Sequence, residues 1–177
     1  MKTRIAVSVV FVLMAATAFA ADNAAAQSEA QQSFNKMKTL AGSWEGRATT
    51  VPLAPEIEGK LMRVSLRVTS MGHTLMHEAT GAGRPDDPIT MFVVDGDRLL
   101  LTHYCDGDNR PRMVGKMSAD GKTVEFDFLD ISGNLQYGHM HHAVFTLIDE
   151  NHHIEDWTYM QPGDKPVHAR FDLQRTK

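Results

Sequence analysis

Histidines are the residues of this sequence whose spacing is best suited to chemistry. His139 and His141 are separated by one residue, and His103 lies two positions before Cys105, the single cysteine. Neutral imidazole and thiolate are ligand types that zinc and copper accept. One hypothesis is therefore a divalent metal site formed by His103, His139 and His141, with Cys105 as a fourth ligand or as a nucleophile.

Standard catalytic motifs do not accompany these residues. The sequence has no Ser-His-Asp order, no glycine-rich phosphate loop and no HExxH helix. A second interpretation is that the histidines form a hydrogen-bonded polar layer without any reaction, because buried imidazoles are costly unless they have partners. The sequence leaves open whether the protein is an enzyme.

Alternating residues predict that most of the chain forms β-strands. Apolar side chains recur at every second position in residues 62–68 and 124–128, which is the period of a strand with one buried face. Turn signals such as Asp120-Gly121 separate the runs. About ten strands are predicted, centred near Trp44, Val64, Leu75, Val93, Leu101, Met113, Phe126, Phe145, Trp157 and Phe171.

Consecutive antiparallel strands without crossover helices hide their edges best when the sheet closes on itself. The expected fold class is therefore all-β, an antiparallel up-and-down barrel of about ten strands. Before the barrel, residues 31–40 place Phe34, Met37 and Leu40 at helical spacing and predict a short amphipathic helix. The expected divisions are 1–20 as a signal peptide, 21–40 as a leader with this helix, and 41–177 as a single barrel domain.

The first twenty residues predict export. Lys2 and Arg4 precede an apolar run, and Ala18-Phe19-Ala20 fits a small-x-small cleavage site. The run is too short for a comfortable membrane span, so we expect a secreted or periplasmic protein without one. The formal net charge of −4 argues against nucleic acid as a partner.

The start of the first strand, Leu40-Ala41-Gly42-Ser43-Trp44-Glu45-Gly46, resembles the Gly-x-Trp signature of lipocalins and other calycins. This resemblance implies that Trp44 plugs the closed end of the barrel, and that a basic residue of the last strand packs across it. Arg175 is the candidate, because an even number of alternating strands brings the first strand's start and the last strand's end to one rim. A cation–π contact between the two is expected.

A longer resemblance covers most of the chain after the signal. The segments that carry it are Leu101-Thr102-His103-Tyr104-Cys105, Asn109-Arg110-Pro111-Arg112-Met113 and His139-Met140-His141. They resemble an uncharacterised group of secreted bacterial lipocalin-like proteins, in which His-Tyr-Cys is followed by Gly-Asn-Gln-Pro-Arg-Met. This chain differs from that pattern at Asp108 and Arg110, and the resemblance implies no established activity.

Strand parity predicts where the polar residues meet. His103 and Cys105 share an apolar strand face, as do His139 and His141, so all four are expected to point inward. Because neighbouring strands run in opposite directions, these residues should reach the rim opposite Trp44. The residues expected to line this open mouth are His77, His103, Cys105, Arg112, His139, His141 and Tyr159.

These patterns favour a binding protein that encloses a small hydrophobic or amphipathic molecule and needs no cofactor. The alternatives are the metal protein or enzyme described above and a purely structural or interaction role. The segment around His168 faintly resembles the proximal-histidine segment of nitrobindin-like haem barrels, but its parity turns His168 outward, which argues against haem. His152 and His153 are expected to be solvated in a turn.

Overall fold

The structure, a computed structural model, describes residues 27–81, 83 and 87–176. The expected signal peptide at 1–20 and the first part of the leader at 21–26 lie outside the described residues.

One α-helix and ten strands make up the regular structure of the described residues, together with a short 3-10 turn between the second and third strands. In chain order they are α1 (Glu29–Lys38), β1 (Gly42–Val51), β2 (Leu61–Thr69), η1 (Ser70–Gly72), β3 (Thr74–Gly81), β4 (Ile89–Asp95), β5 (Arg98–Tyr104), β6 (Asn109–Met117), β7 (Thr123–Gly133), β8 (His139–Asp149), β9 (His152–Gln161) and β10 (Lys165–Arg175).

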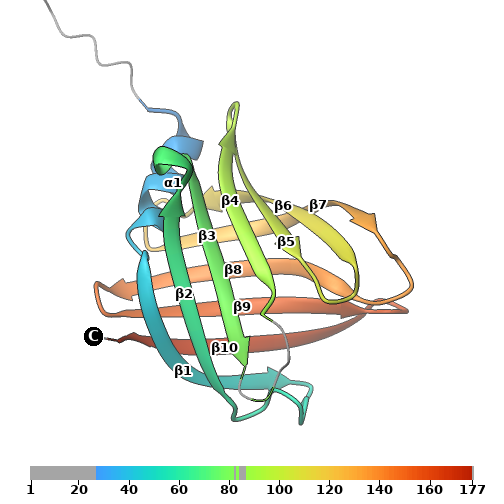
Figure 1. The fold of residues 1–177 in the computed structure, drawn as a ribbon. Helices are drawn as coiled ribbons and strands as arrows, with labels where there is room; N and C mark the ends of the chain where they lie inside the picture. Colours follow the sequence, from blue (N-terminus) through green and yellow to red (C-terminus); the bar gives the residue numbers. More distant parts are fainter. Residues whose placement is uncertain (1–26, 82, 84–86, 177) are drawn as a thin grey trace, which may run out of the picture.

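The ten strands form a closed antiparallel barrel (Figure 1). Each strand pairs with its neighbours in the sequence, and β1 pairs with β10 to complete the ring. The expected all-β up-and-down barrel is confirmed, and each of the ten predicted runs lies in its own strand. Burial alternates as the sequence indicates: in β7, buried Val124 and Phe126 alternate with exposed Glu125 and Asp127.

Helix α1 packs on the barrel through its apolar side. The Oγ of Ser28 caps the helix by accepting a hydrogen bond from the backbone N–H of Gln31. Phe34 and Met37 are almost fully buried. After the helix, the Leu40 carbonyl accepts a 2.8 Å hydrogen bond from Nε1 of Trp44, which fixes the indole at the start of β1.

The β1–β10 seam closes tightly around Gly46. A Cβ atom at this position would lie 1.8 Å from the backbone oxygen of Asp172. The close approach of the two backbones therefore requires glycine. On the same seam Trp44 is the register partner of Arg175, so the first strand begins beside the end of the last.

An aromatic cluster fills part of the barrel interior. Phe92, Phe126 and Phe145 come from three different strands, and their ring centroids are 5.4, 5.6 and 5.9 Å apart in steeply inclined arrangements. Such pairs add about 0.5–1.5 kcal/mol each beyond the burial of their area. Among the described residues, no helix has the length and apolar character needed to cross a membrane.

Candidate functional site

A cavity of about 290 Å³ lies at the end of the barrel opposite Trp44. Residues at the starts of β2, β8 and β10 and at the ends of β3, β5 and β9 line it, whereas Trp44 lies near the start of β1. The volume is close to the lower limit of typical small-molecule pockets. The barrel therefore offers room for a compact molecule at this end.

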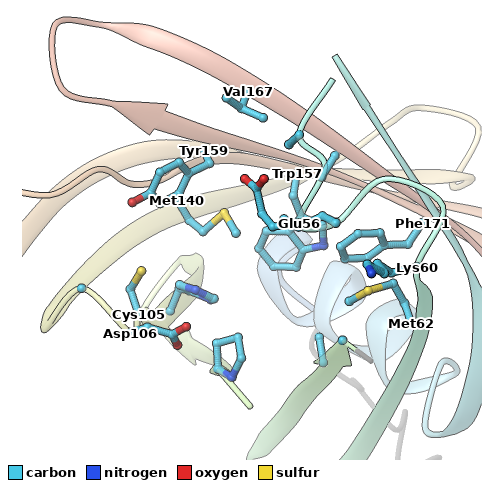
Figure 2. A pocket seen from close by; sticks show the side chains of 18 of the residues that line it. Glu56, Lys60, Met62, Cys105, Asp106, Met140, Trp157, Tyr159, Val167 and Phe171 are labelled. Atoms are coloured by element: carbon cyan, nitrogen blue, oxygen red, sulfur yellow. The ribbon is translucent and has the colours of Figure 1, made fainter. Parts of the chain in front are cut away.

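Most of the cavity wall is apolar. Met62, Met140, Trp157, Val167 and Phe171 contribute to it (Figure 2). Apolar walls of this kind favour the transfer of an apolar molecule from water. The wall alone gives no orientation to a bound molecule.

The loop between β1 and β2 covers part of the cavity. Ala54, Glu56, Ile57 and Lys60 of this loop line it. Hydrogen bonds hold the loop: Oε2 of Glu58 accepts from the hydroxyl and backbone N–H of Thr50 at 2.7 and 2.6 Å, and the Gly59 N–H donates to Ala48 at 2.9 Å. The loop is thereby tied to β1.

Four of the predicted mouth residues line this cavity: His77, His103, Cys105 and Tyr159. His77 and His103 are buried, with 2% and 5% exposure. Nδ1 of His103 is 2.8 Å from the hydroxyl of Thr90. Burial raises the pKa of the Tyr159 phenol, and the nearby Cys105 raises it further, so Tyr159 is a neutral hydroxyl at neutral pH.

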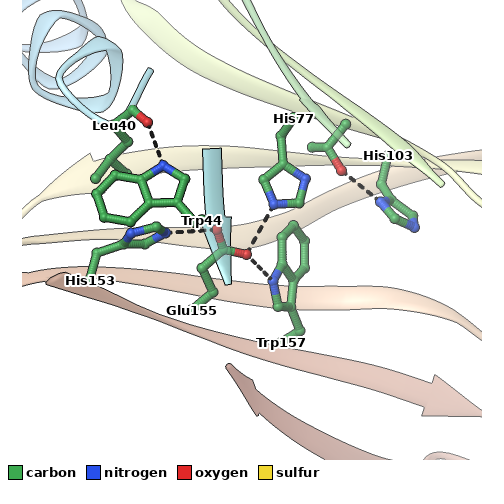
Figure 3. Close-up of polar contacts among 8 residues, drawn as sticks. Leu40, Trp44, His77, His103, His153, Glu155 and Trp157 are labelled. Carbon is green, nitrogen blue, oxygen red and sulfur yellow. Dashed lines mark hydrogen bonds and ion pairs between the residues drawn. The ribbon is translucent and has the colours of Figure 1, made fainter. Parts of the chain in front are cut away.

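Behind His77 lies a buried carboxylate, Glu155, that holds three ring N–H groups (Figure 3). Its Oε2 accepts from Nε2 of His77 and from Nε1 of Trp157, both at 3.0 Å, and its Oε1 accepts from Nε2 of His153 at 3.0 Å. Glu155 and His153 have no exposed surface. Every carboxylate oxygen in this network is therefore hydrogen-bonded.

Glu155 is ionised in the folded protein. Burial alone would raise its pKa, but attraction to His77 and the hydrogen bonds from His153 and His77 outweigh burial and hold the pKa well below its ordinary value. An ionised carboxylate only accepts hydrogen bonds. The Nε2 atoms of His77 and His153 must therefore carry the protons.

The network connects the cavity to the opposite end of the barrel. The ring of His153 meets Trp44 edge to face, with centroids 4.2 Å apart. Arg175 packs over Trp44 in a cation–π contact: its guanidinium carbon lies 4.0 Å from the centroid of the indole ring. Arg175 also donates to the carbonyls of Glu150 and Ala41, both at 2.8 Å, so Trp44 is held by cationic and hydrogen-bonding contacts together.

The structure does not bring His139 and His141 into the cavity wall. A β-bulge between Met140 and His142 makes His141 an extra residue opposite β9, and it is Met140 that lines the cavity. His141 instead stacks on Phe128 at 4.6 Å between centroids, and its Nδ1 is 3.2 Å from Nε2 of His139. Burial, with the nearby His141, lowers the pKa of His139.

Arg112 also lies away from the cavity. It is on an exposed face of β6, where its Nε donates to Oδ1 of Asp130 on β7 at 2.8 Å. The cross-strand ion pair accounts for its orientation. Arg112 is therefore not available to fix the polar end of a molecule in the cavity.

The predicted metal ligands do not converge either. In residues 27–81, 83 and 87–176, one set of three ligand-type side chains has donor atoms within 4.8 Å of one another: Glu125, Asp127 and His142 on the outer wall. In that set Nε2 of His142 is 2.9 Å from Oε1 of Glu125. His103, His139, His141 and Cys105 form no such set.

Sequence reasoning missed Glu155 and was wrong about His153. His153 was expected to be solvated, yet it is fully buried against Trp44. The sequence did indicate that both side chains are buried, because the two-residue alternation that puts Trp157 inside the barrel also puts residues 153 and 155 inside. His168 is exposed on β10, as its parity predicts, and its Nδ1 is 3.1 Å from the hydroxyl of Thr158.

Comparisons with known proteins support the fold. No protein-family model and no curated protein sequence matches this chain. Among solved structures, Rv2717c from M. tuberculosis is similar with a TM-score of 0.58 and 16% identity, over 82% of this chain and 98% of that one. A protein of unknown function from the DUF3598 family of Nostoc punctiforme PCC 73102 has a TM-score of 0.55 and 13% identity over 79% of this chain. The chain spans about half of the Nostoc protein, 49% of its length.

Proposed function

We propose that this barrel binds a small, largely apolar molecule in the cavity and holds the molecule's polar end with His77, His103 and Tyr159. The observation that supports the proposal is an apolar wall interrupted by a few polar side chains, which is typical of small-molecule sites. The size of the cavity favours a compact ligand over a long lipid. The loop carrying Ala54 and Ile57 would cover the bound molecule.

We propose further that the protein is a calycin and is exported. The stack of Arg175 on Trp44 of the Gly-x-Trp segment supports the first proposal. The charged, apolar and small-residue order of residues 1–20 supports the second. N-terminal sequencing of the protein recovered from its host tests export, since processing after Ala20 is expected and a retained Met1 would contradict it.

Native mass spectrometry of the protein purified from its host tests ligand binding. We expect a species heavier than the polypeptide by the mass of one small molecule, which is lost on denaturation. The variant Ala79→Trp places a large side chain in the cavity wall and should abolish that species. Ala119→Trp, at an exposed turn, should retain it.

A variant can lose the ligand by failing to fold, so thermal melting must accompany the spectra. Ala169→Leu adds less volume to the same wall and serves if Ala79→Trp does not fold. The proposal predicts a lower occupancy in whichever folded cavity variant is measured. Equal occupancy in that variant and in Ala119→Trp would overturn it.

A further inference from the structure

His77, a residue that lines the cavity, has a ring nitrogen with an unmet hydrogen-bonding requirement. His77 lines the cavity and is 2% exposed, and its Nε2 is engaged by Glu155 at 3.0 Å. Its other ring nitrogen, Nδ1, is buried and has no hydrogen-bond partner among the residues that the structure describes. Figure 3 shows this nitrogen turned away from Glu155, on the side of His103.

The neighbouring imidazoles do not offer the same opportunity. Nδ1 of His103 already has Thr90 as its partner. Nδ1 of His153 also has no hydrogen-bond partner in the part of the chain that the structure describes, but His153 does not line the cavity and packs against Trp44. A molecule in the cavity therefore gains a hydrogen bond to a buried imidazole most directly at His77, because leaving a buried polar atom unpaired costs free energy.

The surroundings of His77 disfavour an anionic ligand. Glu155 is ionised and lies immediately behind the ring, so a carboxylate bonded to Nδ1 would add a second negative charge across one imidazole in a low-dielectric interior. Among the described residues that line the cavity, Glu56 and Asp106 add two acidic side chains, and Lys60 is the one lysine or arginine (Figure 2). A neutral polar group avoids this repulsion.

A hydroxyl fits His77 in either of its protonation states. It can donate to the lone pair of a neutral Nδ1, and it can accept from Nδ1 if that atom carries a proton. A hydrocarbon would leave the nitrogen unpaired. The small cavity volume of about 290 Å³ restricts the rest of the molecule to a compact apolar body.

We propose that the ligand of this cavity is a compact apolar alcohol or phenol whose hydroxyl hydrogen-bonds to Nδ1 of His77. This inference rests on the proposed function and specifies its ligand class. Tyr159 and His103 line the same cavity.

Equilibrium dialysis of three matched probes tests the inference: 4-butylphenol, butylbenzene and 4-butylbenzoate. The three share an apolar body and differ in the polar group. We expect 4-butylphenol to bind about tenfold or more tightly than either of the others, the ratio that corresponds to one added hydrogen bond of about 1.4 kcal/mol. Equal affinities, or a preference for 4-butylbenzoate, would overturn the hydroxyl assignment while leaving ligand binding intact.

Two variants separate the role of His77 from the stability of the network. His77→Phe should remove the preference for 4-butylphenol over butylbenzene, and His153→Phe, which alters the same Glu155 network away from the cavity, should keep it. If His77→Phe does not fold, the smaller His77→Leu replaces it, because leucine likewise offers no polar atom to the hydroxyl. A preference that survives in a folded His77 variant, or binding of none of the three probes to the wild type, would refute the inference; the second result would also refute the proposed function.

Discussion

Replacing Glu155 with glutamine removes the charge of the buried network while nearly preserving its shape. The single amide oxygen of glutamine can still accept from His77 and Trp157. The amide NH2 group then faces the N–H of His153, so this buried donor loses its acceptor. An unsatisfied buried donor costs about 1–3 kcal/mol, and two hydrogen bonds lose their charge assistance. We expect Glu155→Gln to lower the free energy of unfolding by about 3 kcal/mol in urea titrations followed by circular dichroism.

The same substitution on the outer wall is the matched control. Glu125 is 2.9 Å from Nε2 of His142, but its side chain is 56% exposed, so Glu125→Gln should cost about 0.5 kcal/mol or less. If Glu155→Gln costs no more than this control, the ionised Glu155 and its three hydrogen bonds do not stabilise the folded protein. The comparison removes any general effect of changing one charge.

The stabilisation that Glu155 provides should decrease as the pH falls. The pKa of Glu155 is lower in the folded protein than its ordinary value of 4.5, so its contribution to stability is complete above that value and is lost as the pH falls below it. The difference in unfolding free energy between the wild type and Glu155→Gln should therefore be largest near neutral pH and narrow below about pH 4.5. A difference that widens on acidification would contradict an ionised Glu155.

Three further predictions concern the seam, the closed end and the bulge. Gly46→Ala should destabilise the protein by more than about 3 kcal/mol in urea titrations, because the added Cβ meets a backbone oxygen, whereas Gly107→Ala, with neighbours no closer than 3.4 Å, should cost about 1 kcal/mol or less. Arg175→Met should lower the unfolding free energy by about 2 kcal/mol, through loss of the cation–π contact and of hydrogen bonds to backbone carbonyls. His141→Ala should leave probe binding in dialysis unchanged, and Met140→Ala should weaken it, because Met140 is the residue that lines the cavity.

The barrel could be predicted because its determinants are local and repetitive. Two-residue alternation in segments such as residues 62–68 and glycine-containing turns such as Asp120-Gly121 repeat along the chain, so an error in one strand would leave the others unchanged. The even number of strands also brings Trp44 and Arg175 to one rim, where the structure places the guanidinium over the indole. The position of the β1–β10 seam could therefore be predicted from the number of strands alone.

The cavity lining was harder to predict because parity fails wherever the register shifts. The bulge before His142 inserts one residue, and this exchanges the faces on which His139, Met140 and His141 were expected to lie. Nothing in the local sequence marks the bulge, since histidine and methionine occupy both faces of strands. Parity extended through an undistorted β9 would have identified Glu155, but a glutamate in an apolar interior is expected only when its partners are known.

A high-resolution crystal structure of the protein purified from its own host, without added ligands, tests the central claim most directly. We expect electron density for one compact molecule among Met62, Met140 and Trp157, with a neutral oxygen within hydrogen-bonding distance of Nδ1 of His77. Density for water alone, or wall side chains that close the space, would contradict the claim that this end of the barrel is a ligand site.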